Sequence, residues 1–449
     1  MTETPLSQRF ADAMGQLLGP DFPSDLGLAV SGGGDSMAML YLAHNWTRDF
    51  GVRLWVVTVD HGLRAESAAE AAMVADECAA LGWPHATLRW HWAGSGNVQD
   101  AARRARLSLI DQWRGDLRHV LFAHTVDDQA ETVLMRLARG SGVDGLSGMA
   151  PTREVAPHAI AVPSLEPELM AGLAPPRDAV MPGYRVLRPC LGMERSELRH
   201  YLTVLKGRWV DDPSNDNRDF ERVRIRHLLS LLREDGLTTT VLADTARRMA
   251  RARDGLTARL VDAVRVLTSD APLGQVRIDR DGFAALDEET RLRLLTAGLC
   301  YVSGAEYRPR AASSEALLAR VLSGGGGTLH GAEVLMEKAH LRIVRERSAV
   351  ADVNAVLGVL WDDQWVVTDP SGACSSDARV RALGEDGWNQ IADRTAAGIP
   401  FRAALSVPAV WSDRTLLACP ALGFGPELKV SRFVLGRPDT GFEAFCLSH

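Results

Sequence analysis

Residues 26–36 read Leu26-Gly-Leu-Ala-Val-Ser-Gly-Gly-Gly-Asp-Ser36, an apolar run that passes directly into a glycine-rich loop ending on an acid and a hydroxyl. A loop of this kind presents consecutive backbone N–H groups, and the N-terminus of the following helix, to an anion. The stretch therefore predicts a buried strand, a phosphate-binding turn and a helix. The alternative is a glycine-rich turn that holds no ligand.

Two common phosphate-binding loops do not fit this stretch. The Walker loop ends in Gly-Lys-Ser/Thr, and residues 26–36 contain no lysine. The dinucleotide-binding fingerprint needs a small residue at position 37, where Met37 stands. The remaining pattern, Ser-Gly-Gly-x-Asp-Ser at residues 31–36, resembles the pyrophosphate loop of the N-type ATP pyrophosphatases. That resemblance implies cleavage of ATP to AMP and pyrophosphate, with a substrate oxygen activated as its adenylate.

In the first half of the chain, apolar runs alternate with stretches of helical spacing. This alternation predicts βαβ units, and hence an α/β fold with a doubly wound parallel sheet. Ligands of such sheets collect at the carboxyl ends of the strands. Because Ser31, Asp60 and His124 lie at or just beyond such ends, we expect three segments to meet in one crevice. The expected strands are Leu26–Val30, Leu54–Val59, Ala86–Trp92 and Val120–Ala123, and the expected helices include Met37–Trp46 and Ala68–Leu81.

The length of 449 residues predicts more than one domain. Residues 154–182 hold six prolines and no Phe, Trp or Tyr, which predicts a surface excursion or a mobile loop. Helical spacing returns after Pro189, and a glycine tract at 324–327 precedes a strand-like segment at 329–344. We expect a catalytic domain at 1–228, a helical domain at 229–322 and a small mixed α/β domain at 323–449.

Composition narrows the functional class. The six cysteines include no Cys-x-x-Cys pair, which disfavours a zinc ribbon, a locally held iron–sulfur cluster and a disulfide framework. A net charge of −7 argues against nucleic-acid binding through bulk charge but allows a local basic face. We see no stretch of about 18 apolar residues and no basic, apolar leader. The expectation is a cytoplasmic protein that does not contact membranes.

Acidic residues follow two of the expected strands. Asp60 can accept hydrogen bonds from the ribose or base of a nucleotide, or it can simply form a turn. If a helix begins near Asp127, Asp128 and Glu131 share one face at its N-terminal end. Their mutual repulsion favours a cation between them, either an ammonium group or a metal. Acids in a first helical turn are also favoured by the helix dipole alone, and this remains the alternative.

Several segments together resemble the tRNA(Ile)-lysidine synthetase family, in the family's order and at comparable spacing. The segments are residues 31–36, 59–64, 97–106, 124–149, 209–215 and 222–227. The resemblance covers about residues 26–230. Gln99 and Leu107 depart from the family pattern, which usually has an acid and an aromatic residue there, so no carboxylate role transfers to position 99.

The resemblance implies modification of the wobble cytidine of tRNA(Ile) with a CAU anticodon, changing its codon from AUG to AUA. The cytosine 2-oxygen would attack the α-phosphate of ATP, and free lysine would then displace AMP to give lysidine. A tRNA thiolase of the same superfamily and a non-catalytic RNA-binding protein are the alternatives. The lack of a Cys-x-x-Cys pair disfavours the first, and the retained acids disfavour the second.

The resemblance also implies roles for individual residues. ATP would be held by Ser31, Gly32, Gly33, Gly34, Asp35, Ser36 and Asp60. Asp35, Arg103 and His124 would be catalytic, with Asp35 also positioning Mg²⁺ or the loop. Asp128 and Glu131 would bind the lysine ammonium, and either of them or His124 would take its proton. Contacts with tRNA would come from Arg106, Arg222, Arg224, Arg226, Arg247 and Arg251, although Arg106 could instead contact the α-phosphate and the last two could lie on a solvated helix. The sequence leaves open a monomer or a homodimer.

Overall fold

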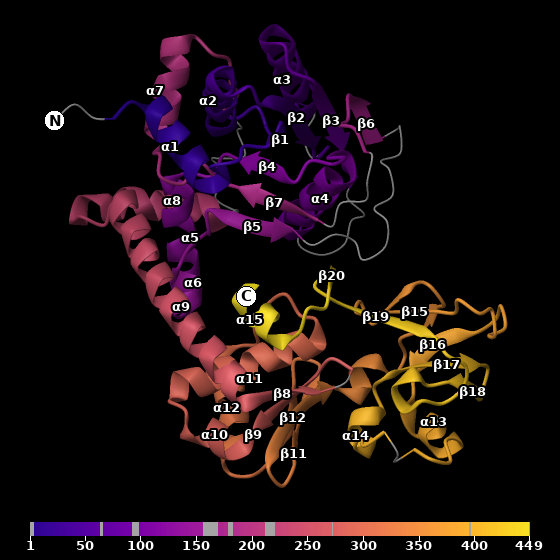
Figure 1. The fold of residues 1–449 in the computed structure, drawn as a ribbon. Coiled ribbons are helices and arrows are strands. Elements are labelled where there is room, and N and C mark those ends of the chain that lie inside the picture. Colours follow the sequence, from indigo (N-terminus) through magenta and orange to yellow (C-terminus); the bar gives the residue numbers. More distant parts are fainter. Residues whose placement is uncertain are drawn as a thin grey trace. The chain divides into compact units, whose positions relative to one another are not determined.

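The computed structural model describes residues 4–62, 66–91, 98–155, 169–177, 183–211, 221–271, 273–394 and 397–448. Their contacts divide the chain into two compact units, residues 1–253 and 254–449 (Figure 1). Within these described ranges, no helix is both long enough and apolar enough to cross a membrane.

A seven-stranded sheet forms the centre of the first unit, in the order β5-β7-β4-β1-β2-β3-β6. The five inner strands are parallel, and the two outer strands pair antiparallel with their neighbours. The strands are β1 (Asp25–Ala29), β2 (Arg53–Asp60), β3 (His85–Arg89), β4 (His119–Phe122), β5 (Thr152–Val155), β6 (Met170–Gly172) and β7 (Tyr184–Leu187). The predicted α/β class is confirmed, and β1 to β4 are the four strands that the apolar runs predict.

Helices cover both faces of this sheet, as Figure 1 shows. Consecutive strand residues point to opposite faces, so Leu121 of β4 packs with helices α1, α2, α3 and α7, whereas Phe122 packs on the side of α4. A third, smaller core joins α5, α8 and the beginning of α9. The helices are α1 (Leu6–Leu18), α2 (Gly34–Phe50), α3 (Ser67–Leu81), α4 (Val98–Trp113), α5 (Val126–Ala138), α6 (Val143–Leu146), α7 (Arg195–Leu205), α8 (Glu221–Leu232) and α9 (Thr239–Leu267).

The proline-containing stretch at 154–182 contributes to the sheet. Its β6 pairs with β3 at one edge, while β5 and β7 lie at the opposite edge. Beyond β6, the carbonyl of Pro176 accepts a hydrogen bond of 2.9 Å from the backbone N–H of Asp116. The prediction of a surface excursion or mobile loop therefore missed an edge strand, because the sequence Met-Ala-Gly carries no strand pattern. Residues 156–168 and 178–182 lie outside the described ranges.

The second unit begins inside α9 and continues with a five-stranded antiparallel sheet, β10-β11-β12-β9-β8, which shares a core with helices of this unit. The strands are β8 (Thr268–Ala271), β9 (Gln275–Asp279), β10 (Gly327–Leu329), β11 (Ala332–Met336) and β12 (His340–Arg345). The helices are α10 (Arg280–Ala285), α11 (Glu288–Ser303) and α12 (Ala311–Leu322). This sheet joins strands from both sides of residue 322. The division at 229–322 and 323–449 remains a prediction, and its middle part is not wholly helical.

Two four-stranded antiparallel sheets follow, in the orders β13-β16-β17-β18 and β14-β15-β19-β20. Their strands are β13 (Ala355–Val356), β14 (Leu360–Trp361), β15 (Trp365–Thr368), β16 (Arg379–Ala382), β17 (Pro408–Ser412), β18 (Thr415–Ala418), β19 (Lys429–Val434) and β20 (Arg437–Pro438). The helices α13 (Gly384–Gln390), α14 (Phe401–Ala404) and α15 (Phe442–Ser448) complete the unit.

Candidate active site

The glycine loop connects β1 to α2 and is closed by one hydroxyl. Ser36 Oγ accepts a hydrogen bond of 3.1 Å from the Ser31 backbone N–H and donates one of 2.9 Å to the Gly33 carbonyl. Its distance to Ser31 Oγ is 3.2 Å. Gly32 has a φ of +87°, a conformation that L side chains rarely adopt. The hydroxyl of Ser36 therefore ties the two ends of the loop together.

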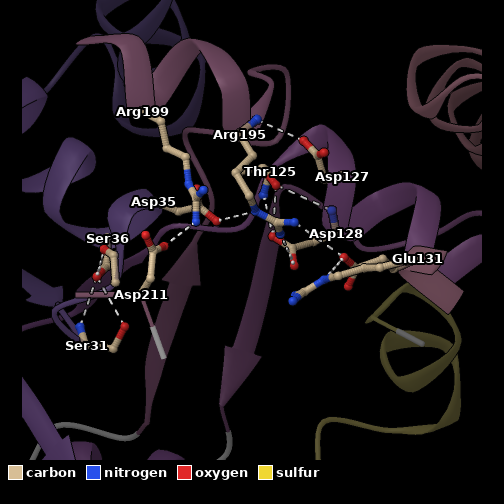
Figure 2. Close-up of polar contacts among 12 residues, drawn as sticks. Ser31, Asp35, Ser36, Thr125, Asp127, Asp128, Glu131, Arg195, Arg199 and Asp211 are labelled. Carbon is tan, nitrogen blue, oxygen red and sulfur yellow. Dashed lines mark hydrogen bonds and ion pairs between the residues drawn. The ribbon is translucent and has the colours of Figure 1, made fainter. Parts of the chain in front are cut away.

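A guanidinium lies at the centre of the acidic residues that the sequence singles out. Figure 2 shows Arg195 between Asp35 and the acids of α5. Its Nε lies 3.0 Å from Asp35 Oδ2, and its Nη2 and Nη1 lie 3.5 Å from Asp128 Oδ1 and 3.6 Å from Glu131 Oε1. The carboxyl ends of β1 and β4 thus bring Asp35, Asp128 and Glu131 together, and the expected convergence of a third segment, at Asp60, stays a prediction.

Asp128 serves two purposes at once. Its Oδ2 accepts hydrogen bonds from the backbone N–H and the hydroxyl of Thr125, at 2.9 and 3.0 Å, which completes a capping box at the start of α5. Its other oxygen, Oδ1, faces Arg195. The helix-start interpretation of this acid is therefore confirmed, and its role in binding lysine stays a prediction.

Glu131 is fully buried and paired with arginines. Its Oε1 accepts a hydrogen bond of 2.6 Å from Arg226 Nε, and its Oε2 lies 4.0 Å from Arg222 Nε. Two of the arginines predicted to contact tRNA therefore contact a predicted lysine ligand in this structure. Arg224, on the same helix, is exposed.

The charges of the cluster shift its pKa values. Burial disfavours the Arg195 cation, but the attraction of Asp35, Asp128 and Glu131 outweighs it and raises the pKa of Arg195. Burial likewise disfavours the Asp128 anion, but Arg195 and the Thr125 hydrogen bond lower its pKa. Burial, reinforced by Asp128 and Asp127, raises the pKa of Asp35 despite the attraction of Arg195.

His124 is placed beside this cluster, after β4. Its ring stacks on Phe122, with centroids 6.1 Å apart and planes inclined by 6°. Burial, together with the charge of Arg188, lowers the pKa of His124 to about 3. The imidazole is therefore neutral at pH 7, and it is a weak acceptor for the proton of an ammonium group near pKa ~10.4.

The remaining predicted residues occupy varied positions. Asp60 forms the turn that the sequence allows, since its Oδ1 accepts a hydrogen bond of 2.9 Å from the Gly62 backbone N–H. Arg103 is exposed on α4, and Arg106 lies over the Phe122 ring at 5.2 Å. Arg247 and Arg251 are exposed on α9, with Arg247 paired to Asp244. Residue roles at these positions stay predictions.

Arg195 lies at the centre of the acidic cluster, and no sequence pattern singled it out. It is the first residue of α7, and its backbone N–H donates a hydrogen bond of 2.8 Å to Asp127 Oδ2. A cation at a helix N-terminus opposes the helix dipole, so an arginine there needs nearby anions. The unfavourable position of Arg195 at the start of a helix is therefore the feature by which the sequence could have revealed it.

Comparisons with known proteins agree with this geometry. The PP-loop domain family matches residues 6–232. The tRNA(Ile)-lysidine synthase of Ruegeria pomeroyi is 39% identical over 430 residues, covering 95% of each chain. That of Hyphomonas neptunium is 36% identical, over 75% of this chain and 86% of its own, and that of Wolbachia pipientis is 30% identical, over 94% and 90%.

Among solved structures, the U34-tRNA thiolase NcsA from Methanococcus maripaludis matches 54% of this chain and 79% of its own, at 14% identity and a TM-score of 0.40. The assignment comes from the sequence relatives, which extend beyond the PP-loop region into the second unit. The chain therefore belongs to the tRNA(Ile)-lysidine synthase family of PP-loop proteins.

Proposed function

We propose that the chain is a tRNA(Ile)-lysidine synthase, a ligase that uses ATP to join the ε-amine of free lysine to C2 of the wobble cytidine in CAU-anticodon tRNA(Ile). The observation that carries the proposal is the convergence of Asp35, Asp128 and Glu131 on one guanidinium beside the glycine loop. A phosphate cradle next to buried carboxylates suits a reaction that expels pyrophosphate and then admits a cationic amine. The names of the relatives support this pair of substrates.

In the first step, the cytosine 2-oxygen attacks the α-phosphorus of ATP, and the bond to pyrophosphate breaks. The backbone N–H groups of Gly32, Gly33 and Gly34 would stabilise the charge that develops on the leaving group, as in an oxyanion hole. Ser36 keeps these groups in place, because its hydroxyl proton is used within the loop.

The Mg²⁺ that accompanies ATP fits one position in this site. Asp35 Oδ1 is buried and has no hydrogen-bond partner, so it is a ready oxygen ligand. No group of three His, Cys, Asp or Glu side chains able to hold a metal occurs among the described residues. Mg²⁺ commonly binds through one or two carboxylates together with substrate phosphates. When bound, the ion would neutralise charge on the phosphate oxygens.

In the second step, the lysine amine attacks C2, and the bond from C2 to the adenylate oxygen breaks, releasing AMP. The ammonium group must first lose a proton. We assign ammonium binding to Asp128 and Glu131, and proton acceptance to whichever of these carboxylates lies within hydrogen-bond reach of the amine.

Recognition of tRNA would extend over the exposed arginines Arg224 and Arg251, and the helical segment at 229–322 would carry part of it. Phosphate contacts from arginine position an RNA, and the wobble base must be unstacked to reach the loop. We propose that the enzyme acts in the cytoplasm. Whether it acts as a monomer or a homodimer is left to the measurement of its mass in solution.

A reconstituted reaction tests the function. The protein is incubated with ATP, Mg²⁺, lysine and CAU-anticodon tRNA(Ile), the RNA is digested, and its nucleosides are identified by mass. We expect lysidine, together with AMP and pyrophosphate, only when lysine is present. The matched control is methionine tRNA, which shares the CAU anticodon and should remain unmodified.

The rival functions give different products in the same experiment. A thiolase would add sulfur independently of lysine, and a non-catalytic RNA-binding protein would bind the tRNA without consuming ATP. Release of ADP in place of AMP would also contradict the proposal.

A further inference from the structure

Two arginines whose Nε atoms are buried lie on the α4 side of the sheet, apart from the carboxylates that Arg195 joins. Arg188 follows β7 directly and is 7% exposed. The parallel pairing of Leu121 with Leu187 places Arg188 beside Phe122, the ring that the Arg106 guanidinium covers at 5.2 Å. The two guanidiniums therefore flank the carboxyl end of β4.

These guanidiniums have few partners. Arg188 Nη1 donates a hydrogen bond of 2.7 Å to the Ala150 carbonyl, but the Nε atoms of Arg188 and Arg106 are buried without one. Within the described part of the chain, neither arginine forms an ion pair with a carboxylate. Burying a cation without a counter-charge is costly, so such a pair is typical of a site that takes up an anion.

The charged groups that face the pair strengthen this interpretation. Burial lowers the pKa of both arginines to about 10, and the cations that contribute further are Arg103 from α4, Arg153 from β5 and Arg222 from α8. His124, whose ring stacks with that of Phe122, is neutral at pH 7. Positive charge from several elements thus gathers where the reaction's anionic substrates would approach.

We propose that Arg106 and Arg188 form a phosphate subsite, separate from the glycine loop, for a phosphate group carried in by a substrate. The loop leads into α2, which packs on the opposite face of the sheet from α4. Guanidinium groups suit phosphate because they offer several donors in a fixed plane. The existence of the subsite is inferred from the structure alone. The identity of the molecule that supplies the phosphate, ATP or the RNA backbone, rests on the proposed function.

Thermal unfolding of the ligand-free protein tests the subsite without turnover. We expect Arg188→Gln to melt at the same temperature as the wild type or higher, because it removes an uncompensated buried charge. Added inorganic phosphate should stabilise the wild type more than the variant, since a ligand stabilises only the form that binds it. A lower melting temperature with an unchanged gain from phosphate would show a structural arginine and overturn the proposal.

Binding measurements identify the source. The affinity for an anticodon stem-loop is measured without ATP, and the affinity for ATP is measured without RNA. Loss of a charged hydrogen-bonding partner should weaken one of them by about tenfold. If the RNA affinity falls, the slope of its dependence on salt concentration should also decrease, by the equivalent of about one phosphate contact. That result would identify the RNA backbone as the source of the phosphate. If the ATP affinity falls instead, the nucleotide supplies the phosphate.

Matched variants keep the result unambiguous. Arg53→Gln removes the same charge at the start of β2, the opposite end of the sheet, and should change neither affinity. Arg106→Gln carries the same test should Arg188→Gln fail to fold. Unchanged affinity for both RNA and ATP, or an effect confined to lysine, would overturn the subsite. The unfolding and binding measurements do not require formation of a product. The proposal of the subsite can therefore be refuted independently of the proposed ligase activity.

Discussion

Arg195 stands at the first position of α7, where its charge opposes the helix dipole, yet three carboxylates surround it. The residue is therefore placed to serve the site and not the helix. It holds Asp128 and Glu131, two like charges on one face of α5, in a fixed arrangement.

Removal of this guanidinium should disable the use of lysine. We expect Arg195→Gln to lower kcat/KM for lysine by about 100-fold, because the carboxylates lose the shared counter-charge that holds them in place. This kcat/KM is measured from the steady-state rate of lysidine formation at varied lysine concentration. Arg48→Gln, in the last turn of α2 and far along the helix from the loop, is the matched control. An unaltered kcat/KM for lysine would remove Arg195 from the site.

The two tasks of Asp128 can be separated by an isosteric change. Asp128→Asn keeps an oxygen for the Thr125 hydrogen bonds but loses the charge. We expect KM for lysine to rise about tenfold, as for other losses of a charged partner, while tRNA affinity stays within about twofold. Kinetics and filter binding are compared, with Asp49→Asn as control. Weakened tRNA binding at an unchanged lysine KM would contradict the assignment.

At the scale of an element, the start of α5 ties helix stability to the site. Thr125 caps the helix and bonds to the carboxylate that faces Arg195. We expect Thr125→Ala to reduce the free energy of unfolding of the first unit by about 1 kcal/mol, the usual effect of losing a cap. Denaturant titration measures it. Thr125→Ser retains the hydroxyl and should recover most of the loss, and equal effects of Ala and Ser would argue against the cap.

The elements also differ in how well the sequence predicts them. The strands β1 to β4 and the acids of α5 follow from local periodicity and from positions at strand ends, so they could be found from neighbouring residues. Arg195 reaches the site from a helix formed much later in the chain, and only the packing of α7 against α2 brings it there. The strand β6 was missed because its three residues are too few to show the alternating pattern of a strand.

At the scale of the whole molecule, the second unit, residues 254–449, was the least predictable part. Its sheets are built from strands of two to six residues, too short for alternation to be distinguished from chance. The five-stranded sheet also joins segments on both sides of α10, α11 and α12, which hides its extent from any local pattern.

The stability of the first unit should depend on pH through three partly buried histidines. Burial lowers the pKa of His124 to about 3 and those of His61 and His85 to about 4. The unfolded chain, with histidines near pKa 6.5, binds more protons, so stability is full above that value and falls as the pH drops toward 4. Melting temperatures between pH 7.5 and 4.5 should show this loss.

Two variants serve as controls for the pH dependence. His85→Gln should reduce the loss, whereas a change of the exposed His200 to Gln should not. A pH dependence that is the same in all three proteins would assign the acid sensitivity to other groups.

The position of Arg195 in the chain has a consequence for synthesis on the ribosome. The nascent polypeptide emerges with Asp35, Asp128 and Glu131 long before the guanidinium that neutralises them. Since domains form as their residues become available, the central strands can pair early while these acids still lack their partner. Translation must therefore pass α7, and then Arg226 on α8, before the first unit can bury these acids, and a chain stalled short of that point would keep them open to water.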